Sequence, residues 1–236
     1  MPRIRLFVDQ PLGSEQTVEL TRDQAHYLFG VMRLGEGAEL AVFNGRDGEW
    51  QARVESAGKR GGTILCEIRT AEQWHPPDLW LLFAPVKKTA TDFIVEKAVE
   101  MGVSRLCPVQ TEFTNSERIR RDRLQAHAVE AAEQCGAVTV PEVAELARLD
   151  RVLADWPEER GLVFCDEGLV GDAVARELPP APAALLIGPE GGFSEQERGK
   201  LAGLAQSLSL GPRILRAETA AVAALALWQA ACGDWR

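Results

Sequence analysis

The sequence predicts an α/β protein whose two domains divide near residue 75, and three observations lead to this interpretation. The first part of the chain contains short apolar runs separated by turn residues, which is typical of a small β-domain. Residues 71–78 (AEQWHPPD) form a proline-containing connector that a helix or central strand does not continue through. From residue 78 onward, apolar runs alternate with helical patterns, which indicates a parallel sheet covered on both faces.

The N-terminal domain is expected to combine several strands with one helix. Strand composition is found in IRLFV (4–8) and GTILCEI (62–68), and a hairpin is predicted over AELAVFNGRDGEWQARVESA (38–57). A helical pattern covers RDQAHYLFGVMR (22–33). Thr21 opens it with Gln24 as a capping box, and Gly35 and Gly37 end it. Short strands with one helix predict a small barrel.

The C-terminal domain is expected to alternate strands and helices. The predicted strands are LWLLFAP (79–85), SRLCPVQ (104–110), GLVFCD (161–166) and AALLIGP (183–189), and a further strand ends at Leu210 in SLSLGP (207–212). The predicted helices are ATDFIVEKAVEMG (90–102), RDRLQAHAVEAAEQCG (121–136), one from Ser194, and one from about Arg216 to Cys232. The stretch ELPPAPAA (177–184) is interpreted as a surface connector.

The composition is that of a globular protein, with 46% hydrophobic and 26% charged residues among 236. No apolar run is long enough to cross a bilayer, and MPRIRLFVDQ lacks the apolar stretch of a signal peptide, so we expect a cytoplasmic protein. The five cysteines are far apart and form no CxxC pair, and the three histidines do not stand at ligand spacing with them. This pattern predicts neither a disulfide framework nor a metal site.

The net charge of −9 and the pI near 5.0 argue against a general nucleic-acid binder, although a local basic patch can dominate on an acidic chain. The candidate patches are Arg3 with Arg5, Lys87 with Lys88, and the cluster Arg118, Arg120, Arg121 and Arg123. The cluster fits a solvated helix face equally well.

The first unusual stretch is LLIGPEGGFSEQE (185–197), where a strand meets Gly-Pro, an acid and two glycines. Gly191 and Gly192 allow a ligand to approach the main chain, and Ser194 with Glu197 forms a capping box for the next helix. A plain tight turn is the simpler interpretation. Glu190 and Glu195 would repel a phosphate, and the chain has no phosphate-binding loop motif, so a neutral or cationic ligand such as a sulfonium compound fits better.

The second stretch, LGPRILRAETAAVAALALWQ (210–229), repeats the apolar-Gly-Pro order before an alanine-rich helix. Arg216 and Glu218 stand two residues apart at its start, and we expect them to bind each other, a ligand or a partner subunit. Both stretches follow predicted parallel strands, and ligands bind at the carboxyl ends of such strands.

Together, these two stretches resemble the cofactor-binding signatures of the SPOUT methyltransferases, and most closely the bacterial 16S rRNA uracil-N3 methyltransferases. The resemblance extends over nearly the whole chain. RLFV, HYLFGVMRLGEG and VFNGRDGEWQARV are similar to that family's PUA-like RNA-binding barrel, and EKAVEMGVSRLCPVQTE and AAEQCGAVTVPEV to the start of its catalytic domain.

The resemblance implies a PUA-like β-barrel over residues 1–73 and a SPOUT methyltransferase domain over 78–236, with a trefoil knot and the cofactor site within 185–232. It implies a homodimer that uses S-adenosylmethionine to methylate N3 of a uridine in 16S rRNA, on the small ribosomal subunit or an assembly intermediate. Adenine is expected near Leu210, Ile214 and Leu215, and the methionine part near Gly188 and Gly191. The implied cofactor-binding residues are Ile187, Gly188, Pro189, Glu190, Gly191, Gly192, Leu210, Gly211, Ile214, Leu215, Arg216, Thr219 and Ala220.

For the reaction, the N3–H of uracil is a weak acid about three pKa units above neutrality, which leaves about 4 kcal/mol for the site to offset. Arg216 is the candidate for stabilising the anion that forms, and Glu218 for orienting Arg216 or taking the proton through water. For the RNA, the candidate phosphate contacts are Arg3, Arg5, Arg33, Lys87 and Lys88.

Two positions depart from the family pattern: Ala90 and Ala137 stand where basic residues are common. They motivate an alternative, a non-catalytic RNA-binding or ribosome-assembly protein on the same fold. The intact GPEGG and RAETA stretches argue against it, because an inactive site would not need those glycines or Arg216 beside Glu218.

Overall fold

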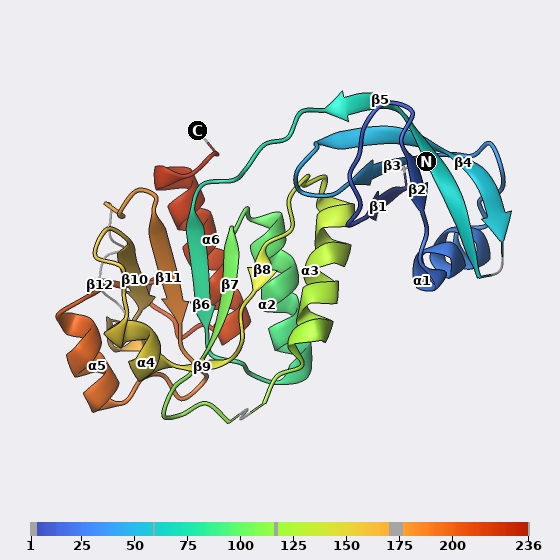
Figure 1. The fold of residues 1–236 in the computed structure, drawn as a ribbon. Coiled ribbons are helices and arrows are strands. Elements are labelled where there is room, and N and C mark those ends of the chain that lie inside the picture. Colours follow the sequence, from blue (N-terminus) through green and yellow to red (C-terminus); the bar gives the residue numbers. More distant parts are fainter. Residues whose placement is uncertain (1–3, 59, 116–117, 170–176, 236) are drawn as a thin grey trace. The chain divides into compact units, whose positions relative to one another are not determined.

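The computed structural model describes residues 4–58, 60–115, 118–169 and 177–235, so Arg3 lies outside the described residues. The chain divides into two compact units (Figure 1). The first comprises Met1–His75 with Ala132–Thr139, and the second comprises Pro76–Ala131 with Val140–Arg236. Each unit is described by itself below.

The first unit is built on a five-stranded sheet. Its strands run in the order β1 (Arg5–Phe7), β3 (Glu39–Phe43), β4 (Glu49–Gly58), β5 (Gly61–Ala71) and β2 (Thr17–Glu19), and only the β1–β3 pair is parallel. The Gln10 side chain, just after β1, bonds both the backbone N and O of Glu19 in β2, which brings the two edges toward each other. The core lies on one face of the sheet and includes Leu28, Leu40 and Ile64.

The predicted helix of this unit changes its type partway along. The Thr21–Gln24 capping box is present and opens α1 (Arg22–Ala25). From there the chain forms a π-helix over His26–Val31, in which Met32 N donates to Tyr27 O at 2.9 Å. The sequence predicts a helix over this stretch, but it does not predict the wider turns of the π-helix.

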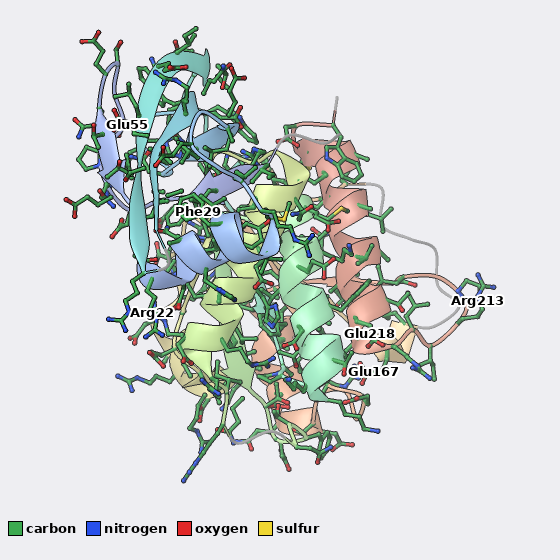
Figure 2. All side chains as sticks on the ribbon, turned by 90° about the vertical axis from the view of Figure 1, so that its right-hand side faces the viewer. Arg22, Phe29, Glu55, Glu167, Arg213 and Glu218 are labelled. Atoms are coloured by element: carbon green, nitrogen blue, oxygen red, sulfur yellow. The ribbon has the colours of Figure 1, made fainter. Side chains whose placement is uncertain are left out.

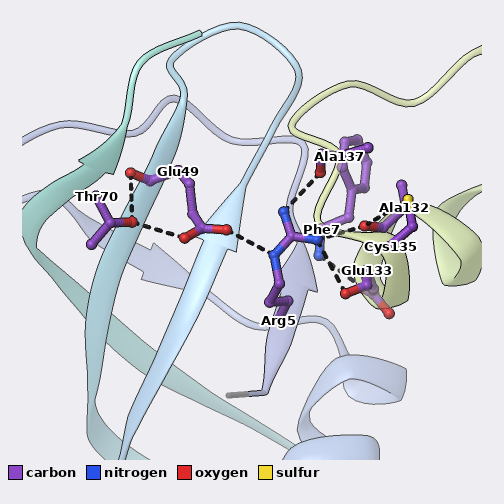
Figure 3. Close-up of polar contacts among 8 residues, drawn as sticks. All are labelled: Arg5, Phe7, Glu49, Thr70, Ala132, Glu133, Cys135 and Ala137. Atoms are coloured by element: carbon purple, nitrogen blue, oxygen red, sulfur yellow. Dashed lines mark hydrogen bonds and ion pairs between the residues drawn. The ribbon is translucent and has the colours of Figure 1, made fainter. Parts of the chain in front are cut away.

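Arg5 sits at the centre of a polar network that ties β1 to residues 132–137 (Figure 3). Its Nε donates to Glu49 Oε2 at 2.7 Å, and its terminal nitrogens donate to the carbonyl oxygens of Ala132, Glu133 and Ala137 at 2.5, 3.1 and 2.7 Å. These carbonyls lie at or beyond the end of α3 (Arg121–Cys135), where backbone acceptors lack helical partners. The Arg5 guanidinium also lies 4.5 Å from the centroid of the Phe43 ring.

The second unit contains a parallel sheet. Its main order is β12 (Gln206–Leu208), β10 (Gly161–Cys165), β11 (Ala183–Ile187), β6 (Leu79–Phe83), β7 (Arg105–Gln110) and β8 (Glu142–Val143), and β9 (Ala147–Arg148) also pairs with β7. All of these pairs are parallel. The near-continuous apolar strands of the sequence are those buried in this sheet, and β11 is buried at every position.

Helices cover both faces of this sheet, as the sequence predicts (Figure 1). The core on one face includes Leu149 of α4 (Leu149–Ala154) and Leu201 of α5 (Glu195–Ala202). On the opposite face α2 (Lys88–Glu100) packs against α6 (Ala217–Cys232). Buried Ala220, Ala221 and Ala224 keep α6 narrow on its inner side. Within the part of the chain that is described, no helix is long and apolar enough to span a membrane.

Candidate active site

A pocket lies at the carboxyl ends of β10, β11 and β12, where the sequence places its two unusual stretches. The space within it is about 620 Å³, which includes open solvent. The pocket is lined by Cys165, Asp166, Glu167, Ile187, Gly188, Pro189, Glu190, Gly192, Leu208, Leu210, Gly211, Arg213, Ile214, Leu215, Ala217 and Ala220.

The first loop supplies main chain with few side chains. Gly192 has φ +68°, a left-handed conformation that favours glycine, and a Cβ at this position would collide with the Glu167 carboxylate. The capping box predicted from Ser194 and Glu197 is present and starts α5 directly after the loop. Gly191 does not line the pocket, and a Cβ added to it would lie 3.1 Å from the Phe113 side chain.

An acidic pair at the end of β10 forms a wall that the sequence analysis did not identify. Asp166 and Glu167 follow the strand, and Arg198 of α5 bonds both carboxylates and donates from Nε to Phe193 O at 3.2 Å. Arg198 therefore connects the end of β10 to the chain just after the first loop. The rule that ligands bind where parallel strands end could have marked Asp166 and Glu167, but their pairing with Arg198 depends on the tertiary fold.

The second loop leaves β12 two residues earlier than predicted, because the strand ends at Leu208. Buried Ser209 donates to Leu169 O at 3.0 Å, and Gly211 follows with φ +99°. Beyond it, Arg213 and Ile214 line the pocket and are exposed, with 79% of Ile214 accessible. Figure 2 shows Arg213 on this loop, ahead of the helix that carries Glu218.

Arg216 and Glu218 stand at the start of α6 with no bond between them. Arg216 is the exposed N-cap residue, its side chain makes no capping bond, and Glu218 is half-buried in the first turn. Neither side chain forms a hydrogen bond or ion pair within the described ranges, so of the three predicted partners a ligand or a partner subunit remains. Neither Arg216 nor Thr219 lines the pocket, although both were expected to bind cofactor.

The chemistry of the pocket favours a neutral or cationic ligand with an apolar part. Three carboxylates, those of Asp166, Glu167 and Glu190, line it. Arg198 pairs with the first two, Arg213 also lines the pocket, and the remaining lining is largely aliphatic or glycine. Burial raises the pKa of the Cys165 thiol at its wall to about 12, so this thiol stays protonated at neutral pH. Among the described residues, no group of three or more His, Cys, Asp or Glu side chains is placed to hold a metal ion.

The predicted RNA contacts lie in different settings. Arg33 is exposed with φ +57°, just after the π-helix, and Lys87 and Lys88 are exposed at the start of α2. The prediction that Arg5 contacts phosphate does not fit the structure, since its side chain is only 11% exposed and is bonded internally to Glu49 and three carbonyls.

Both parts of the chain match known domain families. Residues 73–229 match the sequence model of an RNA methyltransferase domain, and residues 20–68 match that of an RNA methyltransferase PUA domain. The fold, the pocket and these matches define the class as an RNA methyltransferase with a PUA domain.

The relatives narrow this class. Ribosomal RNA small subunit methyltransferase E of Synechocystis is 32% identical over 230 residues, which cover 94% of this chain and 76% of the relative. The protein of that name from Rickettsia conorii is 27% identical over 94% of this chain and 93% of its own. The crystal structure of ribosomal RNA small subunit methyltransferase E from Neisseria gonorrhoeae, bound to S-adenosyl methionine, matches with a TM-score of 0.88 and 28% identity, covering 99% of this chain and 100% of that one. The chain belongs to the family of ribosomal RNA small subunit methyltransferases E.

Proposed function

We propose that this protein transfers the methyl group of S-adenosylmethionine to N3 of a uridine in 16S rRNA. The observation that carries the proposal is the pocket at the ends of β10, β11 and β12, built from bare loops with an acidic wall. The relatives' names add support, because they describe methyltransferases of the small-subunit ribosomal RNA, one of them bound to S-adenosyl methionine.

The residues present suit this cofactor. Its sulfonium is cationic, and the carboxylates of Asp166, Glu167 and Glu190 line the pocket, although Arg198 pairs with the first two. Main-chain groups near Leu210, Ile214 and Leu215 would hold the adenine, and the bare backbone near Gly188 would receive the methionine part. The bound cofactor supplies an electrophilic methyl group for an in-line displacement.

The reacting base needs help because its N3–H is a weak acid. Arg216 is proposed to stabilise the negative charge that develops on the ring as the proton leaves. Glu218, one residue into the helix that Arg216 caps, is proposed to orient that guanidinium or to take the proton through water. The absence of an ion pair between the two, within the described residues, leaves both available for the substrate.

We further assign RNA binding to residues 1–73 and methyl transfer to residues 78–236, and place the trefoil knot within 185–232. A homodimer acting on the small ribosomal subunit completes the proposal. The strand order supports the knot. In the sheet β10 lies between β11 and β12, although in the chain β11 comes between β10 and β12. Ile214 is exposed, and Arg216 has no ion pair with the described residues, and both observations support a partner at this surface.

The proposal is tested by calorimetric titration of the full chain with S-adenosylmethionine, followed by methyl transfer to small subunits from cells lacking this protein. We expect binding at about micromolar cofactor, which corresponds to about 8 kcal/mol, with one site per chain. Mass mapping of the RNA should then place the methyl group on N3 of one uridine. A folded protein that binds no cofactor at about millimolar concentration would instead be the non-catalytic RNA-binding alternative.

A further inference from the structure

A second cavity lies at the carboxyl end of β6, between the starts of α2 and α3. It encloses about 710 Å³, part of it open to solvent. Four of its lining residues are cationic and none is acidic: Lys88, Arg118, Arg120 and Arg123. The other lining residues are Pro85, Val86, Thr91, Ile119 and Leu124. Lys88 stands some thirty residues from the arginine cluster in the sequence, and the fold brings them to one cavity.

The floor of this cavity is fixed by one buried hydroxyl. Thr91 Oγ1 accepts from Val86 N at 3.0 Å and donates to Val86 O at 3.1 Å, and it is only 4% exposed. Both main-chain polar groups of Val86 are thereby hydrogen-bonded, so the chain after β6 has a fixed conformation beneath the cations. Buried Pro85 and Leu124 complete an apolar base beneath the charges.

Two of the four cations pair with carboxylates that do not line the cavity. Arg123 Nη1 bonds Asp92 Oδ2 at 2.7 Å, and Arg120 pairs with Asp122 at 3.2 Å with both side chains 74% exposed. The remaining arginine of the cluster, Arg121, bonds Val143 O at 2.6 Å and does not line the cavity.

The basic cavity belongs to the same edge of the same sheet as the cofactor pocket. β6 and β11 are neighbouring parallel strands, and Ala84 N, at the end of β6, donates to Ile187 O, at the end of β11, at 2.9 Å. Ile187 lines the cofactor pocket, and Pro85 lines the basic cavity. A group held in the cavity therefore lies close, along one sheet edge, to the site of methyl transfer.

From this placement we infer that the cavity formed by Lys88, Arg118, Arg120 and Arg123 binds a backbone phosphate of the substrate RNA next to the nucleotide being methylated. The inference rests on the proposed function for its substrate. Guanidinium forks bind phosphate oxygens in pairs, and phosphate contacts set the position of the RNA without reading its sequence. A chain with net charge −9 needs such a local concentration of cations to hold RNA.

An RNA phosphate suits the cavity better than a free phosphate ion. Lys88, Arg118 and Arg120 are exposed around an open cavity, which a continuing polymer can enter and leave. A site for a small free anion would instead enclose its ligand and desolvate the cations. Competition distinguishes the two sources. An oligoribonucleotide should displace the bound 16S rRNA fragment, whereas inorganic phosphate at about its physiological millimolar level should not.

The test uses the full-length chain with Lys88→Gln and Arg120→Gln combined, and Lys200→Gln as the matched control. Lys200 is an exposed lysine on α5 that lines neither cavity. Steady-state methyl transfer to unmethylated small subunits gives KM and kcat, and calorimetry gives the Kd for S-adenosylmethionine. Direct binding to a labelled 16S rRNA fragment is measured over a range of salt concentrations.

We expect the double variant to raise KM for subunits about tenfold or more, with kcat and the cofactor Kd unchanged. Its log–log salt dependence of RNA binding should be shallower by about 0.7 to 0.9, the change expected when the contact with one phosphate is lost. The Lys200→Gln chain should match the wild type. The inference is overturned if the double variant has the KM and salt slope of the wild type. It is also overturned if inorganic phosphate occupies the cavity while RNA binding does not change.

The failure of this inference can be distinguished from failure of the proposed function. If the wild-type chain transfers no methyl group, the proposed function fails, while the salt dependence of RNA binding still reports on the cavity. If the wild-type chain is active and the double variant has the same KM and salt dependence, only the inference of a phosphate site fails. A variant that loses cofactor binding is replaced by the single substitution Arg120→Gln, whose side chain is 74% exposed.

Discussion

Two arginines of equal formal charge have opposite surroundings in this protein. The guanidinium of Arg5 is bonded to one carboxylate and three carbonyl oxygens, and it lies against the Phe43 ring. Arg216, in contrast, is exposed at the start of α6, and its side chain has no hydrogen-bond or ion-pair partner among the described residues. A cation that is already paired contributes to stability, whereas an unpaired one beside a pocket is available to a ligand.

We therefore predict that Arg216→Ala lowers turnover by at least about a hundredfold, the usual loss when one group that stabilises developing charge is removed. Cofactor binding should change little, because Arg216 does not line the pocket. Single-turnover methyl transfer with saturating RNA separates this effect from binding. Arg213→Ala, on the same loop, is the comparison variant and should mainly weaken cofactor binding. Near-wild-type turnover of purified Arg216→Ala would remove this residue from the mechanism.

At the scale of elements, the loops around the pocket depend on contacts that cross between strands. Gly192 adopts φ +68° with the Glu167 carboxylate against its α-carbon, and Arg198 holds Glu167 and Asp166 from α5. The first loop, the end of β10 and α5 thus act as one assembly. A change in any of the three is expected to alter the others.

Gly192→Ala tests this assembly. A left-handed conformation costs a non-glycine residue about 1–2 kcal/mol, and the added methyl group would displace Glu167. We expect the affinity for S-adenosylmethionine to fall about tenfold or more, measured by calorimetry. The matched control is Gly199→Ala within α5, where an added Cβ meets nothing within 4 Å and alanine favours the helix. Equal cofactor affinity in both variants would show that the loop tolerates the change.

Local patterns in the sequence were sufficient for the elements that carry their own signals. The capping boxes at Thr21 and Ser194 and the start of α6 after Arg216 are all confirmed. The π-helix, β2 and α4 were not predicted, because they are short and their conformation depends on packing. In the site, glycine-rich strand ends marked two walls of the pocket. The third wall, Asp166 with Glu167, also follows a predicted strand, but its pairing with Arg198 depends on the tertiary fold. The basic cavity joins Lys88 to arginines that are distant in the sequence, so it has no local signature.

At the scale of the whole molecule, we expect one buried and two half-buried thiols to affect the response of both units to alkaline pH. Burial raises the pKa of Cys66, in the first unit, to about 11. It raises that of Cys107 to about 11 and that of Cys165 to about 12, both in the second unit. In the unfolded chain these thiols ionise near pH 8.5. Because the folded-state pKa values are higher, these thiols do not lower the free energy of unfolding below this pH. The free energy of unfolding then falls as the pH rises toward the folded-state values.

We predict that the free energy of unfolding is flat from about pH 7 to about pH 8.5 and falls steadily by about pH 10.5 in both units. Urea unfolding under reducing conditions, followed by peptide-resolved hydrogen exchange, reports each unit separately. Cys66→Ala should lower the stability of the first unit at neutral pH through lost packing, yet reduce its further loss at alkaline pH. Cys135→Ala, which removes an exposed thiol, is the control and should follow the wild type. If the first unit of Cys66→Ala loses as much stability between these pH values as the wild type, then ionisation of Cys66 does not drive the alkaline transition, and lysine or tyrosine titration takes its place.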